Sequence, residues 1–151
     1  MKNIFNETIE SLENYFISIN EKKYRATQIY DYLYKKRIYD IKKMTNISNN
    51  LKEKILKNYN FDFIKIITKQ EDTDVKKYLF KLADGNTIES VLMYHNYGIS
   101  ICVSSQVGCN MGCAFCESGR LKKVRNLETY EIVEQLLLIE EDIKDRITHV
   151  V

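Results

Sequence analysis

The pattern that most limits the folds open to this chain lies in its last third, where a strand, a loop, a helix and a second strand follow one another. Residues 99–103 form an apolar, β-branched run, residues 128–142 place Ile and Leu at helical spacing, and residues 147–151 return to β-branched side chains. Two strands joined through a helix are predicted to run parallel in one sheet. Because one or two parallel strands cannot bury themselves, we expect this chain to be the N-terminal part of a longer α/β protein.

The preceding residues divide by hydrophobic period into a helical front and a β-rich middle. Apolar residues at helical spacing predict helices over residues 6–17, over residues 24–36 and after a turn at 45–48. Asn6 is the expected N-cap of the first helix. After residue 60, β-forming side chains and the turn residues 84–86 predict a strand followed by a β-hairpin.

Composition narrows the class of protein. The chain has no Pro and no Trp, and it is 44% hydrophobic and 29% charged, which suits a folded globular protein. It shows neither a secretory leader nor an apolar run of about 18 residues, so we expect no membrane span and a cytoplasmic location. In that reducing compartment, the 4 cysteines indicate metal ligands or buried thiols before disulfides.

Basic residues gather at the front of the chain. Residues 1–60 hold 12 of the 23 Lys and Arg but only 7 of the 21 Asp and Glu. They are interleaved with tyrosines such as Tyr24, Tyr30 and Tyr32, a composition that can contact phosphates and stack on bases. A solvated helical face with tyrosines in its core would have the same composition, so both interpretations stay open.

A cysteine loop marked by glycines follows the predicted strand at residues 99–103. Its cysteines, at C-x3-C-x2-C spacing, are Cys109, Cys113 and Cys116. The glycines allow the backbone to wrap closely around a bound group. Three thiolates can hold three corners of a cubane iron–sulfur cluster and leave the fourth iron open to an outside ligand, which indicates catalysis.

Two other interpretations of the cysteines compete with the cluster. Cys102 could join the other three as a tetrahedral zinc site in an RNA-binding module without catalysis. Structural zinc usually uses two close cysteine pairs, whereas Cys102 lies in an apolar strand, where we expect a buried thiol. A set of structural thiols without any ligand is disfavoured by the flanking glycines.

The cysteine spacing, the aromatic residue before the last cysteine and the helix that follows resemble the radical S-adenosylmethionine superfamily. Further short motifs resemble the RlmN/Cfr family of RNA adenine methyltransferases. These motifs are residues 24–29 (YRATQI), 77–85 (KYLFKLADG), 88–92 (IESVL), 102–109 (CVSSQVGC) and 125–127 (RNL). Their order around the cysteine loop extends the resemblance over nearly the whole chain.

The resemblance implies an α/β fold that ends in the first βαβ unit of a truncated, partial (β/α)6 radical-SAM barrel. The implied domains are a helical accessory RNA-binding domain at 1–60, a β-hairpin extension at 61–98 and the start of the barrel at 99–151. The implied reaction is methylation of an adenine carbon, with carbon 2 favoured over carbon 8, in 23S ribosomal RNA and, for RlmN-like members, in tRNA. It uses a methyl-cysteine that lies beyond residue 151.

The resemblance also implies cofactors, partners and site residues. The cofactors are a 4Fe-4S cluster and S-adenosylmethionine, and the partners are RNA and an external electron donor such as flavodoxin or ferredoxin; we expect a monomer. By position, Cys109, Cys113 and Cys116 would ligate the cluster. Phe115 would lie near the adenosyl group, and Glu89 would be the catalytic proton acceptor.

Overall fold

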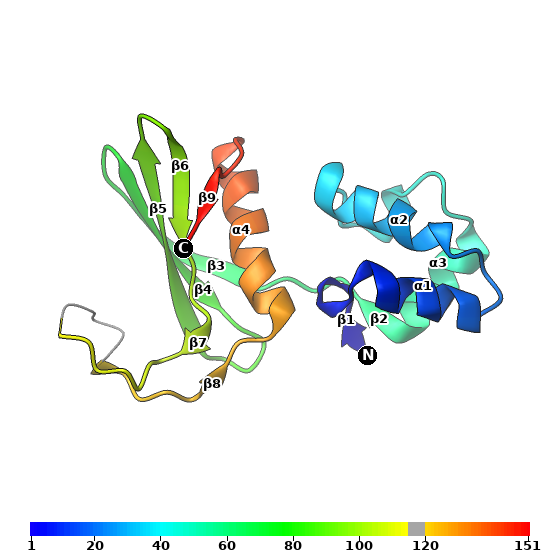
Figure 1. Cartoon of the computed structure of the whole chain (residues 1–151), viewed down its shortest axis with the longest axis horizontal. Helices are drawn as coiled ribbons and strands as arrows, with labels where there is room; N and C mark the ends of the chain where they lie inside the picture. Colours follow the sequence, from blue (N-terminus) through cyan, green and yellow to red (C-terminus); the bar gives the residue numbers. More distant parts are fainter. Residues whose placement is uncertain (115–119) are drawn as a thin grey trace. The chain divides into compact units, whose positions relative to one another are not determined.

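The computed structural model describes residues 1–114 and 120–151, which form two compact units, Met1–Asp62 and Phe63–Val151 (Figure 1). Each unit buries its own set of apolar side chains. Of the helices in these described residues, none has the length and apolar composition needed to cross a membrane.

The first unit is helical, as the hydrophobic spacing predicted. Its helices are α1 (Ile9–Ser18), α2 (Tyr24–Tyr30) and α3 (Asn49–Asn58), with 3-10 turns at Ile4–Asn6 and Ile41–Lys43 and a π-helical turn at Asp31–Lys35. The short strands β1 (Lys2–Asn3) and β2 (Tyr59–Asn60) pair in parallel. Apolar side chains from all three helices, such as Phe16, Ile29 and Ile55, are buried.

Capping contacts define where α1 and α3 begin. Thr8 Oγ1 accepts the Ser11 amide at 3.1 Å, and Ser11 Oγ accepts the Thr8 amide at 2.9 Å, which makes a reciprocal capping box for α1. The prediction of Asn6 as this cap is wrong, because Asn6 ends the preceding 3-10 turn. Ser48 caps α3 by accepting the Leu51 amide at 3.3 Å, within the predicted turn.

The second unit is built on a five-stranded sheet with the strand order β3-β4-β5-β6-β9. Its strands are β3 (Lys65–Glu71), β4 (Val75–Lys81), β5 (Thr87–His95), β6 (Gly98–Cys102) and β9 (His149–Val150). Neighbours from β3 to β6 are antiparallel, and β9 is parallel to β6. The hairpin predicted around residues 84–86 is confirmed as β4 and β5.

The parallel strand pair confirms the predicted βαβ unit. In it, Ser100 of β6 lies beside His149 of β9, and Ile101 lies beside Val150. The connection between the two strands contains β7 (Gln106–Val107), β8 (Arg125–Asn126) and the crossover helix α4 (Thr129–Ile143). The fold is therefore mixed α/β, while the partial barrel that would continue it stays a prediction.

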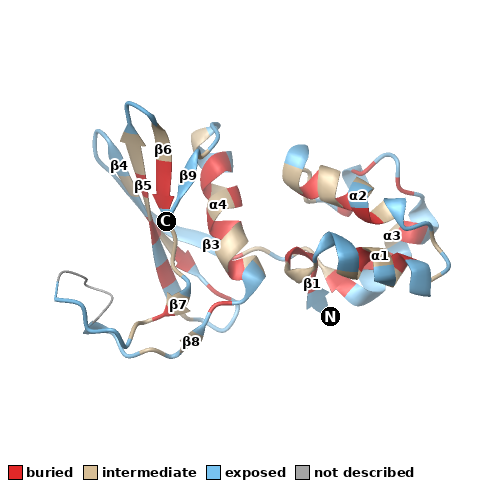
Figure 2. Cartoon of the chain, viewed as in Figure 1, coloured by how far each residue is buried: buried red, intermediate tan, exposed pale blue. Residues whose placement is uncertain are grey.

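Helix α4 packs against one face of the sheet, where alternate strand residues are buried (Figure 2). Tyr78, Leu92 and Ile101 of the sheet share this core with Ile139 of α4. Complete burial of apolar side chains of this size contributes roughly 1.5–3 kcal/mol each. The core fixes α4 against the strands, and so fixes the point from which the cysteine loop departs.

Candidate functional site

The cysteine loop is carried on a narrow, two-stranded neck that follows β6. In the neck, β7 pairs with β8 in antiparallel fashion, with Val107 beside Arg125. The Leu127 amide donates to the Ser105 carbonyl at 2.9 Å and extends this pairing toward the sheet. Since Val107 and Leu127 are both buried in the core of the second unit, the base of the neck is anchored by apolar contacts.

Close backbone contacts continue from the neck into the loop. The Cys109 amide donates to the Leu121 carbonyl at 2.9 Å. Gly108 has a φ of +69°, and a Cβ at this position would lie 2.1 Å from the Lys122 carbonyl oxygen. Gly112 also has a positive φ, of +62°, but a Cβ added at this position would have no atom within 4 Å. Glycine is therefore required at residue 108 both by conformation and by space.

The described cysteines of the loop are accessible thiols. Cys109 is partly exposed, Cys113 is exposed, and neither forms a disulfide. The Met111 amide donates to Cys109 Sγ at 3.4 Å, and hydrogen bonds to sulfur of this kind tune the cysteine ligands of iron–sulfur clusters. The predicted residues Phe115 and Cys116 lie outside the described residues. The donor chemistry of Cys109 and Cys113 fits an iron–sulfur cluster, and the full ligand set stays a prediction.

Within residues 1–114 and 120–151, no group of three or more His, Cys, Asp or Glu side chains is placed to hold a metal ion. Cys116 is not among these residues. Cys102 is exposed at the end of β6, so the expectation of a buried thiol is wrong. Its partner on β5 is Val91, which points away from the buried Leu92, so both lie on the sheet face opposite α4.

Glu89 lies on the same face of the sheet, the open face opposite α4. Its side chain is 52% exposed and forms an ion pair with Lys77, with Oε1 3.2 Å from Nζ. Its backbone carbonyl accepts the Ser104 hydroxyl at 2.6 Å, next to the start of the neck. The carboxylate is therefore reachable from solvent near the cysteine loop's point of departure, and its proposed role as a proton acceptor stays a prediction.

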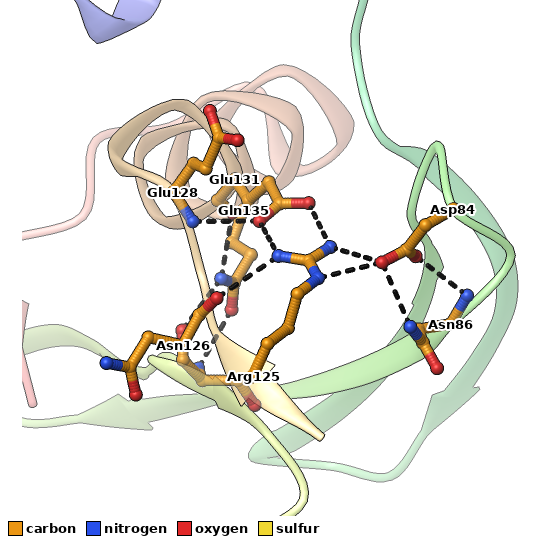
Figure 3. Close-up of polar contacts among 8 residues, drawn as sticks. Asp84, Asn86, Arg125, Asn126, Glu128, Glu131 and Gln135 are labelled. Carbon is orange, nitrogen blue, oxygen red and sulfur yellow. Dashed lines mark hydrogen bonds and ion pairs between the residues drawn. The ribbon is translucent and has the colours of Figure 1, made fainter. Parts of the chain in front are cut away.

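Arg125 joins the neck to α4 and to the turn between β4 and β5 (Figure 3). Its Nη1 and Nη2 donate to the two carboxylate oxygens of Glu131 at 2.7 and 2.8 Å, and its Nε donates to Asp84 Oδ2 at 2.7 Å. Glu131 is 1% exposed and also accepts the Glu128 amide at 2.8 Å, at the start of α4. Such a bidentate pair provides directional as well as electrostatic stabilisation.

These contacts keep the cluster of charges ionised. Burial opposes the charge of Glu131, but hydrogen bonds from Arg125 and the Glu128 amide hold the pKa of its carboxyl below the usual value. The Asn86 side chain and amide, followed by Arg125, lower the pKa of Asp84. The hydrogen bond to Glu131 raises the pKa of Arg125 despite partial burial. The guanidinium is thus paired with two ionised carboxylates, which together carry more charge than is needed to neutralise it.

Gln135 of α4 holds the segment that enters the neck from β6. Its buried Oε1 accepts the Ser104 amide at 2.9 Å and the Ser90 hydroxyl at 2.6 Å, and its Nε2 donates to the Ser104 carbonyl at 2.9 Å. Ser104 connects β6 to β7. The neck is consequently tied to one helix on both sides, through Gln135 at Ser104, just before β7, and through Arg125 in β8.

The sequence did not predict Arg125, Glu131 or Gln135 as residues of the site. One signal was available, because Glu128 and Glu131 have the three-residue spacing of a capping box at the start of a periodic helix. No local spacing reveals that Arg125 also reaches Asp84, which lies 41 residues away.

The tyrosines in the basic front of the chain are divided between core and surface. Tyr32 is 3% exposed, and Lys36 Nζ lies 4.2 Å from its ring centroid. Tyr24 is 51% exposed, and the Arg25 guanidinium lies 5.1 Å from its ring. A tyrosine core and an aromatic, basic surface therefore coexist in the first unit, and RNA contact by that surface stays a prediction.

The fold and the loop define an α/β protein that carries accessible thiols beyond the carboxyl end of a parallel strand, where α/β proteins commonly bind their ligands. The chain is similar to the crystal structure of a radical SAM methyltransferase from Sphaerobacter thermophilus. The two share 27% sequence identity with a TM-score of 0.86, over 99% of this chain and 46% of that chain. Residues 2–60 match the family described as ribosomal RNA large subunit methyltransferase N-terminal domain.

Curated relatives match the chain over its whole length. A protein of Spiroplasma citri is 44% identical over 155 residues, which cover 100% of this chain and 45% of the relative. One of Enterococcus faecalis is 44% identical, over 99% of this chain and 44% of the relative. Both are named probable dual-specificity RNA methyltransferase RlmN. The chain thus spans less than half the length of these relatives, and it is similar to the N-terminal portion of RlmN/Cfr family members.

Proposed function

We propose that this chain is the front half of a radical S-adenosylmethionine methyltransferase that methylates an adenine carbon of RNA. The observation that carries this proposal is a loop with accessible thiols, held beyond β6 in a chain similar throughout to proteins named RNA methyltransferases. The proposed target is carbon 2 of adenine, in preference to carbon 8, in 23S ribosomal RNA and also in tRNA. A methyl-carrying cysteine outside this chain would complete the reaction.

In the proposed reaction, residues of the cysteine loop bind the cofactors, and a residue of the open sheet face acts on the substrate. Cys109, Cys113 and Cys116 would hold a 4Fe-4S cluster with one open iron, and Phe115 would lie beside the adenosyl group of S-adenosylmethionine. When bound, these cofactors supply one-electron, carbon-radical chemistry. Glu89, exposed on the open face, would accept the proton that leaves the adenine carbon.

The two structural units supply the proposed binding functions. Residues 1–60 would form an accessory RNA-binding domain, because their basic excess and exposed aromatic residues suit phosphates and bases. Residues 61–98 would form a β extension, and residues 99–151 would begin the barrel. An external donor such as flavodoxin or ferredoxin would supply the electron to a cytoplasmic, monomeric enzyme.

Anaerobic reconstitution of the full-length protein with iron and sulfide tests the cluster. We expect a brown protein with about four irons and four sulfides per chain. Replacement of Cys109, Cys113 or Cys116 by Ala should abolish this content, and Cys102→Ala should leave it unchanged. A colourless protein that holds one zinc, and loses it in Cys102→Ala, would contradict the proposal and support a zinc-binding RNA module.

Mass spectrometric mapping of methyladenosine tests the reaction itself. Ribosomal RNA and tRNA from cells with the full-length gene should carry a carbon-methylated adenosine that is missing without the gene. Glu89→Gln should lower methylation by about 100-fold or more while the iron content is retained, because a general base contributes that much. Identical RNA from both kinds of cell would contradict the proposed reaction.

A further inference from the structure

We infer that Arg125 is a positioning residue, which fixes the cysteine loop to α4 and to the turn between β4 and β5, and that it does not bind RNA phosphates. Its catalytic consequence rests on the proposed function, since a cluster held by the loop would move with the neck. Its structural part does not, because the contacts of Arg125 exist in the protein without cofactors.

The sequence around Arg125 favours a different role. Residues 120–125 read RLKKVR, a basic stretch of the kind that contacts nucleic-acid phosphates. In the structure, however, the Nε, Nη1 and Nη2 atoms of Arg125 all donate to protein oxygens, those of Asp84, Glu131 and the Asn126 carbonyl. A phosphate would have to displace ionised carboxylates from a guanidinium whose charge they already balance. Arg125 therefore differs from the lysines of the same stretch, because its guanidinium donors are already bonded to protein oxygens.

The place of Arg125 in the neck gives its contacts mechanical importance. It is the register partner of Val107, which lies two residues before Cys109. The β7–β8 ladder pairs only two residues on each side, and so short a ribbon is weakly stable in isolation. Gln135 holds Ser104, just before the first strand of the ribbon. Arg125 provides the polar side-chain link from the second strand to α4.

Loss of the Arg125 side chain should therefore loosen the loop locally. In Arg125→Gln, the buried Glu131 carboxylate keeps the Glu128 amide but loses both guanidinium bonds, and the link to Asp84 is broken. The neck can then shift against α4, and a displacement of about 1 Å at a reacting centre is enough to lower a rate about 100-fold. RNA affinity should change little, because no phosphate contact is removed.

Hydrogen exchange of the full-length protein, prepared without cofactors, tests the structural part. We expect the amides of Cys109 and Leu127 in the neck to exchange at least about tenfold faster in Arg125→Gln, whereas the Leu92 amide in the sheet core should not change. The matched control is Arg146→Gln, which removes an arginine paired with Glu140 at 3.2 Å near the other end of α4. That variant should leave the neck amides as they are.

Two further variants keep the test decisive. Arg125→Lys should protect the neck only partly, because an ammonium group cannot make the bidentate contact with Glu131 while also bonding Asp84. If Arg125→Gln does not fold, Asp84→Ala removes the acceptor and so breaks the exposed arm of the network, and the Cys109 and Leu127 amides should exchange faster in it too. Unchanged neck exchange in whichever variant folds would overturn the inference.

The loaded enzyme provides an independent measurement. In Arg125→Gln, the electron paramagnetic resonance signal of the reduced cluster should respond differently to added S-adenosylmethionine, and more cofactor should be cleaved per methyl group transferred. A loss of RNA affinity with a shallower salt dependence, at normal neck exchange, would instead make Arg125 a phosphate contact. If the wild-type protein holds no cluster, the proposed function fails, while the exchange experiment still decides the role of Arg125.

Discussion

Two glycines of the cysteine loop have the same backbone conformation but different surroundings, which makes them a matched pair for mutation. Gly108 and Gly112 have φ values of +69° and +62°. An alanine in this left-handed region is disfavoured by about 1–2 kcal/mol at either position. Only at residue 108 would the new Cβ also meet backbone, 2.1 Å from the Lys122 carbonyl oxygen. Gly108→Ala should therefore damage the loop far more than Gly112→Ala.

The size of the difference follows from the contacts across the neck. The 2.1 Å contact must lengthen to about 3 Å before any real Cβ can be accommodated, and a backbone carbonyl cannot turn aside like a flexible side chain. Separation of the strands by that amount breaks the 2.9 Å hydrogen bond from the Cys109 amide to the Leu121 carbonyl. A hydrogen bond of this kind is worth about 1 kcal/mol. With residual strain added, Gly108→Ala should cost about 2–4 kcal/mol, against about 1–2 kcal/mol for Gly112→Ala.

Iron retention by the full-length protein measures this effect where it matters. After anaerobic reconstitution, Gly108→Ala should lose iron to a chelator about 5- to 30-fold faster than Gly112→Ala, as expected from a difference of about 1–2 kcal/mol. Equal iron loss from Gly108→Ala and Gly112→Ala would refute the steric explanation.

Three further predictions concern stability and RNA binding. The pKa of the Glu131 carboxyl is lowered in the folded protein. The stabilisation that this carboxylate provides is therefore present above its ordinary pKa of about 4.5 and disappears as the pH falls through the folded value. Urea unfolding from about pH 5 to pH 3 should show a shallower loss of stability in Glu131→Gln than in wild type. The buried Tyr78 hydroxyl donates to Asp142 Oδ2 at 2.8 Å, so Tyr78→Phe should lower the free energy of unfolding by about 1–2 kcal/mol in the same assay, and no change would mean that solvent replaces the bond. Deletion of residues 1–62 should weaken RNA binding in fluorescence anisotropy and flatten its dependence on salt, whereas unchanged affinity would contradict an RNA-binding role for the first unit.

Hydrophobic period located the main elements well, because it depends on burial of local stripes of side chains. The helices of the first unit, the hairpin turn at residues 84–86 and the parallel strand pair were all predicted in this way. The same signal failed on the inner face of α4. Ile132 and Leu136 of its apolar stripe are only partly buried, whereas Glu134 and Gln135 are completely buried. Apolar spacing cannot show that a polar side chain has a partner in another element.

The same distinction between local and long-range contacts applies to the candidate site. The cysteine spacing is local, so the sequence alone predicts a metal-binding loop with three thiols, and the ligand set stays a prediction. The position of the loop depends on contacts across long stretches of chain. Arg125 reaches Asp84 across 41 residues, and Ser104 reaches Gln135 across 31. Such pairs form only after the sheet and α4 have come together, and no spacing in the sequence encodes them.

The buried carboxylates of α4 explain how one helix can position several connections at once. Glu131 accepts the Glu128 amide at 2.8 Å and binds Arg125 of the neck, Glu134 accepts the Ile64 amide at 2.8 Å, and Glu140 accepts the Ile147 amide at 3.0 Å. These amides lie where the chain enters α4, the sheet and β9. Apolar packing stabilises without direction, whereas a charge-assisted hydrogen bond also specifies distance and angle.

Replacement of one of these carboxylates by an apolar residue of similar size would preserve burial but leave a backbone amide without its partner, at a cost of about 1–3 kcal/mol. The buried face of α4 therefore has less apolar surface, but its carboxylates make hydrogen bonds that define the connections to the ends of strands. For a chain whose function would depend on where a loop-bound cluster sits, this exchange is favourable. The core holds α4 against the sheet, and the polar groups of α4 in turn determine where the cysteine loop begins and ends.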